Sequence, residues 1–326
     1  MSVGILLPQP YETDVVRFVE WIESLGYASF WTSELWGADA LVHLGVGAAT
    51  STDLKVGTAI VNVFSRTPAT LAMAATTIAQ LADDRAVIGL GVSTPRAIEG
   101  IHGMAYDRPL RRLRETVELI HRLTSSADRV TYNGTILSVD GLPALERPVP
   151  VYAAALGEKS RELTGAFCDG WLPHNIPYPA ISTAFEAVER GAHRVGREPD
   201  DIVVSPHLPS AVCDDITEAR ALLRNHIAYY VGSGDGYRRA VALSFPERAD
   251  QIATAWKTGD RDAARSLVTR EMIDAIGLAA TPAEAPDRLA AFESTDIVDE
   301  IRIVTPTGTP PAIIDLTINT LAPTAR

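Results

Sequence analysis

Apolar residues along the chain occur in two patterns that alternate. Short continuous runs, beginning with 3–7, are typical of strands that are buried on both faces. Longer stretches such as 13–26 repeat their apolar positions with the period of a helix. Gly26 closes the first helical stretch, and Pro68 suits the first turn of a later one. Such a succession of strand–helix units favours a parallel sheet covered by helices.

The predicted strands lie at 3–7, 27–31, 54–63, 86–92, 150–156, 169–173, 201–212 and 299–306. The predicted helices lie at 13–26, 40–51, 67–82, 109–126, 158–168, 180–196, 215–231, 281–295 and 309–321. The best single account is an α/β fold in which residues 1–326 form one domain, a closed (β/α)8 TIM barrel. A doubly wound open sheet is the alternative.

Two stretches do not follow the alternation. Asn133-Gly134 lies between alternating runs within 129–139, and this pattern predicts a β-hairpin inserted after the fourth helix. Residues from about 232 to 280 are mostly helical with weak punctuation. We interpret them as a helical insertion before the eighth strand.

Composition argues against several classes of protein. Hydrophobic residues make up 46% of the chain, which is ample for a core. No window holds ~18 successive apolar residues, so no membrane span is expected. The amino-terminal residues lack the basic region of a signal peptide, and the only cysteines are Cys168 and Cys213, which fits a reducing cytoplasm. A net charge of −12 argues against nucleic acid as a partner.

Two glycine-bearing turns are the first candidates for chemistry. They are GLGVS (89–93) and ALGEKS (155–160), which follow the fourth and fifth predicted strands. Ligands of such barrels bind at the carboxyl ends of the strands, where these turns would be neighbours. The helix start after Gly157 would present unpaired N–H groups that suit a phosphate, with Lys159 and Ser160 beside it. A capped turn with a solvated lysine is the alternative interpretation.

Other polar candidates follow other predicted strands. Glu34 is a candidate general acid after the second strand. In the same loop, Asp39 could hold a polar ligand, and Trp36 could form one side of a pocket for an aromatic ring. Asn62 ends the third strand and would point its amide at the mouth. Candidates for contact with a substrate are Glu99 and His102, on a predicted loop after the fourth strand, and His174; His207 also follows a strand. No HExxH motif or clustered His/Asp spacing occurs, so no metal is expected.

Together these stretches resemble the luciferase-like monooxygenase superfamily, and most closely its branch that uses the deazaflavin coenzyme F420. The resembling segments are GYASFWTSELWGADAL (26–41), KVGTAIVNVFSRTPATLAMAATTIAQL (55–81), RAVIGLGVS (85–93), EGIHG (99–103), RPLRRLRETVELI (108–120), PVYAAALGEKSRELTGAFCDGWLP (150–173) and, less clearly, GLAATPAEAPDRLAAF (277–292). The first 175 residues match in order and spacing, whereas 200–275 match poorly. The resemblance implies a barrel with an insertion in its later half.

The resemblance also implies where a cofactor binds. A tricyclic ring is expected across the ends of the third and fourth strands, where Ala59-Ile60 corresponds to a bulge that holds a non-proline cis peptide bond in the family. The residues expected to contact the cofactor are Trp36, Asp39, Ala59, Ile60, Asn62, Gly91, Val92 and Ser93, with Leu156, Gly157, Glu158, Lys159 and Ser160 around its phosphate.

One position departs from the family pattern. Several relatives have Asp-His after the second strand, and that histidine takes part in the chemistry of some of them, whereas this chain has Glu34-Leu35. A histidine mechanism therefore does not transfer to this chain. Glu34 is the expected polar group near the ring, as an orienting residue or as a proton donor.

The activity implied by the resemblance is hydride transfer between coenzyme F420 and a small organic substrate. A one-carbon carrier of the methylene-tetrahydromethanopterin or folate type is the specific hypothesis. An FMN-dependent monooxygenase of the same fold and a non-catalytic flavin-binding barrel are the alternatives. Relatives pair through their second and third helices, and the Ala- and Thr-rich stretch at 67–82 fits a homodimer or a higher homo-oligomer.

Overall fold

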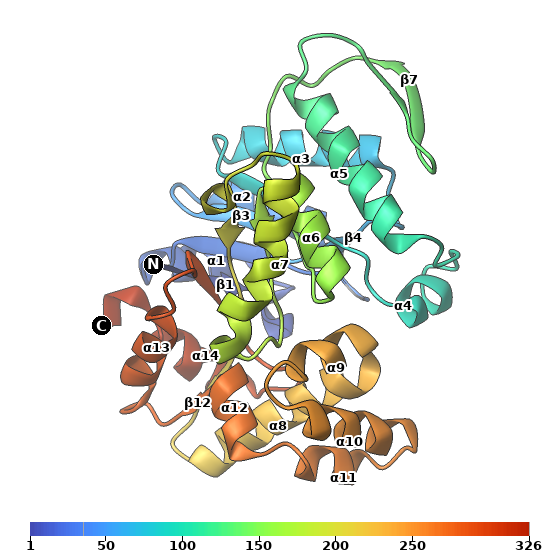
Figure 1. The fold of residues 1–326 in the computed structure, drawn as a ribbon. Helices are drawn as coiled ribbons and strands as arrows, with labels where there is room; N and C mark the ends of the chain where they lie inside the picture. Colours follow the sequence, from blue (N-terminus) through green and yellow to red (C-terminus); the bar gives the residue numbers. More distant parts are fainter. Residues whose placement is uncertain (35, 326) are drawn as a thin grey trace.

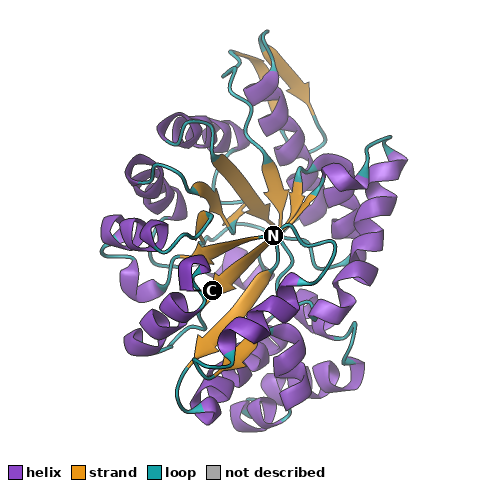
Figure 2. Cartoon of the chain, turned by 90° about the vertical axis from the view of Figure 1, so that its left-hand side faces the viewer, coloured by secondary structure: helices purple, strands orange, loops and turns teal. Residues whose placement is uncertain are grey.

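The computed structural model describes residues 1–34 and 36–325. Its main sheet is parallel and curls on itself, with the helices outside it (Figure 2). The hydrogen-bonded order is β10-β9-β8-β5-β3-β2-β1-β13-β11-β12, and β4 also pairs with β5. The strands of this sheet are β1 (Ser2–Leu6), β2 (Ser29–Thr32), β3 (Lys55–Thr58), β4 (Val61–Asn62), β5 (Ala86–Gly91), β8 (Val151–Ala153), β9 (Gly170–Trp171), β10 (Val203–Val204), β11 (His207–Val212), β12 (Leu278–Ala280) and β13 (Glu300–Val304).

One short stretch of chain links β10, at one end of the sheet, to β11, the strand next to the other end. β10 pairs with β9 and β11 pairs with β13, and only Ser205 and Pro206 separate β10 from β11. The Ser205 N–H donates to the carbonyl of Trp171 at 2.9 Å, and the Pro206 carbonyl accepts from the Arg302 N–H at 2.9 Å. The first strand, β1, pairs directly with the last, β13. This order is that of a TIM-barrel-like sheet and does not fit a doubly wound open sheet.

The helices lie close to their predicted positions (Figure 1). Asp39 caps the start of the second helix through the N–H groups of Leu41 and Val42, and Thr67 caps the third just before Pro68. The helices are α1 (Val15–Ser24), α2 (Ala40–Thr50), α3 (Pro68–Leu81), α4 (Pro95–Gly100), α5 (Pro109–Ser125), α6 (Glu158–Phe167), α7 (Ile181–Arg194), α8 (Ile216–Ser233), α9 (Asp235–Val241), α10 (Pro246–Lys257), α11 (Arg261–Ser266), α12 (Arg270–Ile276), α13 (Ala285–Glu293) and α14 (Pro311–Thr320).

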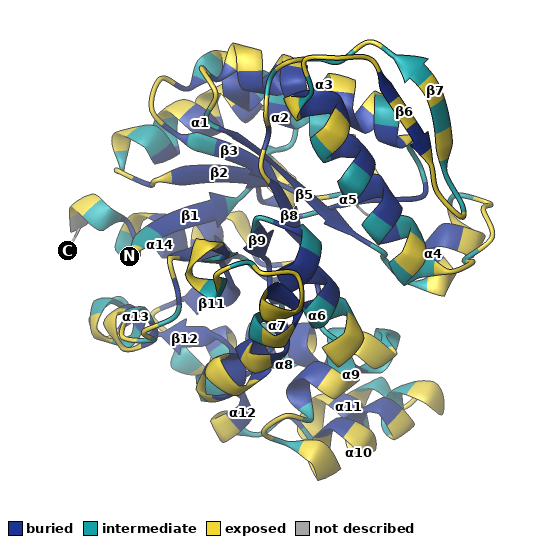
Figure 3. Ribbon diagram, turned by 45° about the horizontal axis from the view of Figure 1, so that its top comes forward, coloured by how far each residue is buried: buried dark blue, intermediate teal, exposed yellow. Residues whose placement is uncertain are grey.

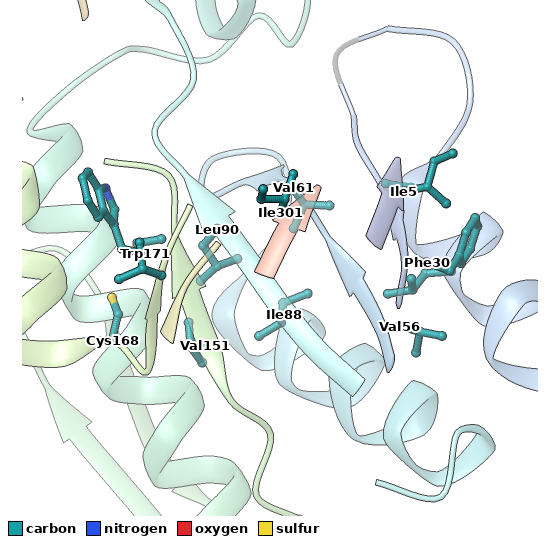
Figure 4. Packing of buried hydrophobic residues seen from close by; sticks show 14 of the residues in the cluster. Ile5, Phe30, Val56, Val61, Ile88, Leu90, Val151, Cys168, Trp171 and Ile301 are labelled. Carbon is teal, nitrogen blue, oxygen red and sulfur yellow. The ribbon is translucent and has the colours of Figure 1, made fainter. Parts of the chain in front are cut away.

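Alternate residues of the strands serve two different cores. One set faces the surrounding helices and joins the main hydrophobic cluster; Figure 4 shows Phe30, Val56 and Ile88 among its members. The other set, which includes Trp31 and Tyr152, forms a smaller cluster inside the curled sheet. The strands are therefore buried along most of their length, while exposed residues gather on the outer faces of the helices (Figure 3). This double burial explains why the strands read as continuous apolar runs.

The predicted hairpin is present outside the main sheet. β6 (Val130–Asn133) and β7 (Ser138–Leu142) pair antiparallel, and the structure places them beside α5 (Figure 1). The buried carboxylate of Glu115, on α5, accepts hydrogen bonds from the N–H groups of Thr135, Ile136 and Leu137 at 2.9, 2.8 and 2.9 Å. One side chain thereby satisfies the turn and fixes the hairpin to the helix.

The second irregular stretch requires a correction at its end. Helices α9, α10, α11 and α12 follow α8 and share a separate apolar cluster with it, but 278–280 is not helical as predicted. It forms strand β12, which pairs with β11. Gly277 lets the chain run this close to β11, because a side-chain carbon there would lie 2.5 Å from the Pro209 carbonyl oxygen.

The predicted loop after the fourth strand also differs from the structure. Residues 95–100 form the short helix α4, whose first turn is capped by the Thr94 side chain. Glu99 is therefore an exposed helical residue, and only His102 lies on the loop that follows. The proline at the start of α4 and the glycine at its end made this turn of helix look like a loop in the sequence. In the part of the chain that the structure describes, no helix has both the length and the apolar character to cross a membrane.

Candidate functional site

The two glycine-bearing turns lie side by side at the carboxyl end of the sheet, as predicted. β5 pairs directly with β8, so that Leu90 is level with Ala153, and β4 places Asn62 opposite Gly91. The N–H of Ala154 continues this ladder to the Leu90 carbonyl at 2.9 Å. The ends of three neighbouring strands thus form one continuous surface at the mouth.

The centre of this surface is kept flat by Gly91. A side-chain carbon added at Gly91 would lie 2.8 Å from Cδ1 of Ile60 and 3.7 Å from Cβ of Ala154. Ile60 follows a cis peptide bond from Ala59, between β3 and β4, as the resemblance implies. Val92 and Ser93 continue the chain from Gly91, and both keep part of their surface exposed. The mouth therefore has a glycine floor with an apolar edge at Ile60.

The start of α6 supplies hydrogen-bond donors. Gly157 occupies the capping position without a capping side chain. Among the described residues, no acceptor bonds the N–H groups of Glu158 and Lys159. The Ser160 hydroxyl does not add to them, because it donates to the Gly157 carbonyl at 2.7 Å. An open helix start of this kind is suited to an anion.

The side chains around this helix start have separate roles. Glu158 points to Arg190 on α7, with Oε1 and Nη2 2.6 Å apart, so its carboxylate is directed away from the helix start. The Lys159 side chain is exposed. Arg161, which the sequence analysis did not single out, is buried and donates to the Leu156 carbonyl at 2.6 Å, while its Nε has no partner. Burial lowers the pKa of Arg161.

Asn62 is buried at the edge of the surface, with its two amide atoms in different roles. Its Oδ1 accepts from the N–H groups of Phe64 and Ser65 at 2.9 and 2.8 Å, which fixes the turn after β4. Its Nδ2 lies 3.4 Å from Nε2 of His102. Asn62 and His102, which were separate predictions, are thus brought together. The ring of Tyr106 closes the same corner and stacks on Phe64 at 5.3 Å.

Glu34 is held in an ion pair. Its two carboxylate oxygens accept from Nη1 and Nη2 of Arg66 at 2.9 and 2.8 Å, and Nη2 also bonds Asp39. The Glu34 N–H donates to the carbonyl of Ile60 at 3.1 Å. Hydrogen bonding to Glu34 raises the pKa of Arg66. This arrangement ties the loop after β2 to the segment that follows the cis bond.

The remaining candidates near this loop lie farther out. The Trp36 side chain is 79% exposed. Asp39 is exposed and engaged in capping α2 and in binding Arg66. Glu99 is exposed on α4, where its carboxylate accepts from the Tyr106 N–H at 3.4 Å. Leu35, the position at which some relatives have histidine, lies outside the described residues.

A second group of polar side chains lies across the mouth, after β9. His174 meets the rings of His207 and Tyr230 at 4.7 and 4.5 Å, and its Nε2 is 3.4 Å from Nε2 of His226. Burial lowers the pKa of His226 to about 3, and burial also holds the pKa values of His174 and His207 well below the usual range. These histidines are therefore neutral at ordinary pH. Within the described residues, no cluster of histidine, cysteine and acidic side chains has the geometry of a metal site.

Sequence reasoning missed several members of this group. His226 and Tyr230 lie on α8, in the stretch that carries few recognisable signals. The start of α9 covers both glycine-bearing turns, because a side-chain carbon at Gly234 would lie 3.8 Å from Thr94 and one at Gly236 would lie 3.7 Å from Leu156. Arg302 was also missed, although its place between two isoleucines of a strand marks it as an inward-facing charge.

The residues present fit a phosphorylated cofactor with a flat ring. The open start of α6 offers donors to a phosphate, and the glycine floor at Gly91 leaves room for a planar group beside it. The described fold and site therefore define a TIM-barrel-like α/β protein with an anion-binding turn at its mouth. The sequence profile of the luciferase-like monooxygenase family matches residues 4–298, and the chain belongs to that family.

Two individual relatives within this family are similar to the chain over most of its length. The chain is 27% identical over 311 residues to a 5,10-methylenetetrahydromethanopterin reductase of Archaeoglobus fulgidus, with 92% of each chain covered. It is 27% identical over 278 residues to a Mycobacterium tuberculosis protein named for coenzyme F420-dependent oxidoreductase activity, with 77% of this chain and 79% of the relative covered.

Solved structures share the fold. The F420-dependent tetrahydromethanopterin reductase of Methanopyrus kandleri has a TM-score of 0.81 at 22% identity, over 99% of this chain and 97% of the other. An F420-dependent secondary alcohol dehydrogenase has a TM-score of 0.78 at 18% identity over the full length of both chains. At these identities the likeness establishes the fold alone.

Proposed function

We propose that this protein is an oxidoreductase that transfers a hydride between coenzyme F420 and a small organic substrate. The observation that carries the proposal is the open start of α6 directly beside the glycine floor of β5. The names of the relatives support the choice of coenzyme F420, since they include a coenzyme F420-dependent oxidoreductase and structures of F420-dependent enzymes. When bound, the coenzyme supplies the hydride chemistry, and the protein supplies position and exclusion of water.

Different residues would bind the phosphate and the ring of the coenzyme. The N–H groups of Glu158 and Lys159 would hold the phosphate, and Leu156 and Gly157 would form the turn below it. Gly91, Val92 and Ser93 would line one face of the ring. Asn62 would offer its Nδ2, because its Oδ1 is already bonded to the turn after β4. The start of α9 would cover the bound coenzyme and limit the access of water.

For Glu34 we propose an orienting role. The earlier expectation left a choice between an orienting residue and a proton donor. Both carboxylate oxygens of Glu34 accept hydrogen bonds from Arg66 and hold the loop after β2 in place, which suits a positioning role. Its N–H bond to Ile60 instead positions the segment against which the ring would lie. His102, 3.4 Å from Asn62, is the neighbouring group that could exchange a proton with a substrate.

The substrate is proposed at the level of its class. The relatives named as methylenetetrahydromethanopterin reductases make a reduced-pterin carrier of one-carbon units the first compound to test. A substrate would reach the ring between α4 and the segment after β9, where His102 and His174 lie. We keep both residues as proposed substrate contacts, with Glu99 farther out on α4.

We also propose that two copies pair through α2 and α3. Several apolar side chains remain exposed on this face, including Val42 at 63%, Met73 at 52% and Leu81 at 49%. They line one shallow pocket together with small residues such as Gly45 and Ala74. Apolar patches of this kind are typical of surfaces that are covered in an oligomer. Sedimentation equilibrium would test this: a Leu81→Lys variant that sediments as the wild type does would count against this interface.

A binding titration tests the proposed function. Coenzyme F420 is added to the purified protein, and its fluorescence is followed with FMN and riboflavin as parallel ligands. We expect a saturable change at micromolar concentrations for coenzyme F420, weaker binding of FMN and no measurable binding of riboflavin, which has no phosphate. The absence of a saturable change with coenzyme F420 would remove the proposal. Tight FMN binding with oxygen uptake would replace it with the monooxygenase alternative.

A further inference from the structure

Arg302 is a charged residue in the middle of a barrel strand, and the proposed function gives it no role. Its neighbours Ile301 and Ile303 join the helix-facing core, so Arg302 faces the interior of the sheet. The side chain is 0% exposed, and its guanidinium carbon lies 4.9 Å from the ring of Trp31. A buried charge of this kind is costly unless it has a partner.

The partners that Arg302 has do not neutralise it. Nε and Nη2 both donate to the Ser205 carbonyl, the former at 3.1 Å, while Nη1 is buried without any hydrogen bond. Among residues 1–34 and 36–325 no carboxylate forms an ion pair with it. Glu300, two positions earlier, uses its carboxylate for Lys55, Ser29 and Trp31. Burial lowers the pKa of Arg302 to about 9, so the group is still charged at neutral pH.

The residue opposite Arg302 is equally short of partners. His207 is level with Arg302 across the β11–β13 pairing, and both of its ring nitrogens are buried without a hydrogen bond. The hydroxyls of Ser205 and Tyr178 are also buried and unpartnered. Each of these groups can donate a hydrogen bond, and none of them is a carboxylate. Buried donors without acceptors are rare, and several of them around one cation are suited to an acidic ligand.

We propose that Arg302 and His207 form an anion-binding subsite inside the barrel, which takes a carboxylate group of the substrate. A guanidinium with a free N–H and a neutral imidazole N–H can both donate to the oxygens of a planar carboxylate. The assignment of that carboxylate to the substrate rests on the proposed function, because the ring would lie on the opposite wall at Gly91. Leu6, Ile60 and Ala154 pack against the interior cluster and would supply the apolar surface between the two walls.

The subsite also explains how an acidic protein attracts an anionic substrate. The chain carries a net charge of −12, so its overall field repels anions. A single cation in a low-dielectric interior acts at short range and more strongly than a solvated surface charge. Burial holds the pKa values of His174 and His207 well below the usual range, so these residues add no positive charge near Arg302.

The test uses calorimetric titration of the whole protein with acetate and, separately, with inorganic phosphate. We expect acetate to bind the wild type and Arg302→Met to weaken it by about tenfold or more. Arg302→Lys keeps the positive charge but loses the paired donors of the guanidinium, so its acetate affinity should lie between those of the wild type and Arg302→Met. His207→Leu provides a second variant should Arg302→Met fail to fold, and Arg265→Met on the exposed helix α11 is the matched control.

Saturating coenzyme F420 separates this subsite from the phosphate position at α6. The coenzyme should displace inorganic phosphate from α6 but leave acetate bound at Arg302. Three results would overturn the subsite. They are no acetate binding by the wild type, wild-type acetate affinity in both the Arg302 and the His207 variants, and displacement of acetate by the coenzyme. Failure of coenzyme binding with acetate binding intact would instead count against the proposed function and leave the subsite standing.

Discussion

Two arginines, the partly buried Arg66 at the barrel mouth and the fully buried Arg302 inside the barrel, have their charges satisfied differently. On the side of β2 and β3, Arg66 reaches two carboxylates, those of Glu34 and Asp39. Inside the barrel, Arg302 donates to no described residue other than Ser205, through its backbone carbonyl, and its Nη1 has no hydrogen bond. A polar group whose hydrogen bonds are all made within the protein has a structural role. A buried polar group without hydrogen-bond partners is available to a ligand. Whether a polar side chain has hydrogen-bond partners within the protein therefore separates structural from ligand-binding residues better than its distance from the barrel mouth does.

The largest effect is expected at the glycine floor. Gly91→Val would place a branched side chain against Ile60, where even one added carbon would lie 2.8 Å from Cδ1. Its methyl groups would also occupy space that the ring is proposed to take, so the affinity for coenzyme F420 should fall by about 100-fold. Fluorescence titration measures the change. Gly100→Val is the control, because a side-chain carbon there would meet nothing within 4 Å beyond its chain neighbours and its own helix backbone.

An unchanged affinity in Gly91→Val would place the ring away from β5. The two glycine-bearing turns would then not bind the same coenzyme molecule. A loss in both variants would indicate a general effect of valine on the fold, which circular dichroism would reveal.

The next effect concerns the satisfied side of the mouth. Arg66→Met leaves the Glu34 carboxylate, whose side chain is only 11% exposed, without its cation. Removing one partner of such a pair should lower the free energy of unfolding by about 2 kcal/mol, which urea denaturation measures. Arg302→Met should cost less, because it strands no carboxylate. Adding Glu34→Gln to Arg66→Met should restore part of the loss, whereas strict additivity would mean that the pair contributes nothing.

Much of this fold could be predicted from the sequence, because strands buried on both faces and amphipathic helices leave clear patterns. The adjacency of Gly91 and Gly157 followed from the parallel order of the strands alone. Arg66 and Glu34 could not be paired in advance, since 32 residues separate them and both lie in loops. His226 belongs to a helix of the irregular segment, whose packing depends on contacts that no local pattern encodes. Arg302 is visible in the sequence as a charge between isoleucines, but no local pattern shows which groups it meets inside the sheet.

A satisfied carboxylate far from the mouth provides a further check. Burial pushes the pKa of Glu115 up, but hydrogen bonds from Ile136, Leu137 and Thr135 outweigh it, so the pKa is lowered overall. Because the folded-state pKa is depressed, this stabilisation is present above the ordinary glutamate pKa of about 4.3 and is lost as the pH falls through the folded value. Glu115→Gln should therefore reduce the free energy of unfolding by about 1.5 kcal/mol at pH 7 and by less at acidic pH.

Glu115→Gln should leave the affinity for coenzyme F420 as it is in the wild type. Urea unfolding at several pH values, with the same titration beside it, measures both quantities. The exposed Glu186→Gln on α7 serves as the control and should change neither. A variant that lost coenzyme affinity together with stability would contradict the separation of structural and ligand-binding polar groups.

The smallest effect is expected at Lys159, the one lysine beside the start of α6. Its side chain is exposed and bonds no residue that the structure describes, so it can help a phosphate only as a solvated charge. Such charges are largely screened, and Lys159→Gln should weaken coenzyme F420 by about threefold at low salt and not measurably at 1 M salt. Lys257→Gln at the end of α10 is the matched control. A loss beyond about 30-fold would mean that the lysine closes onto the phosphate, and then the backbone of α6 could no longer be credited with most of the binding.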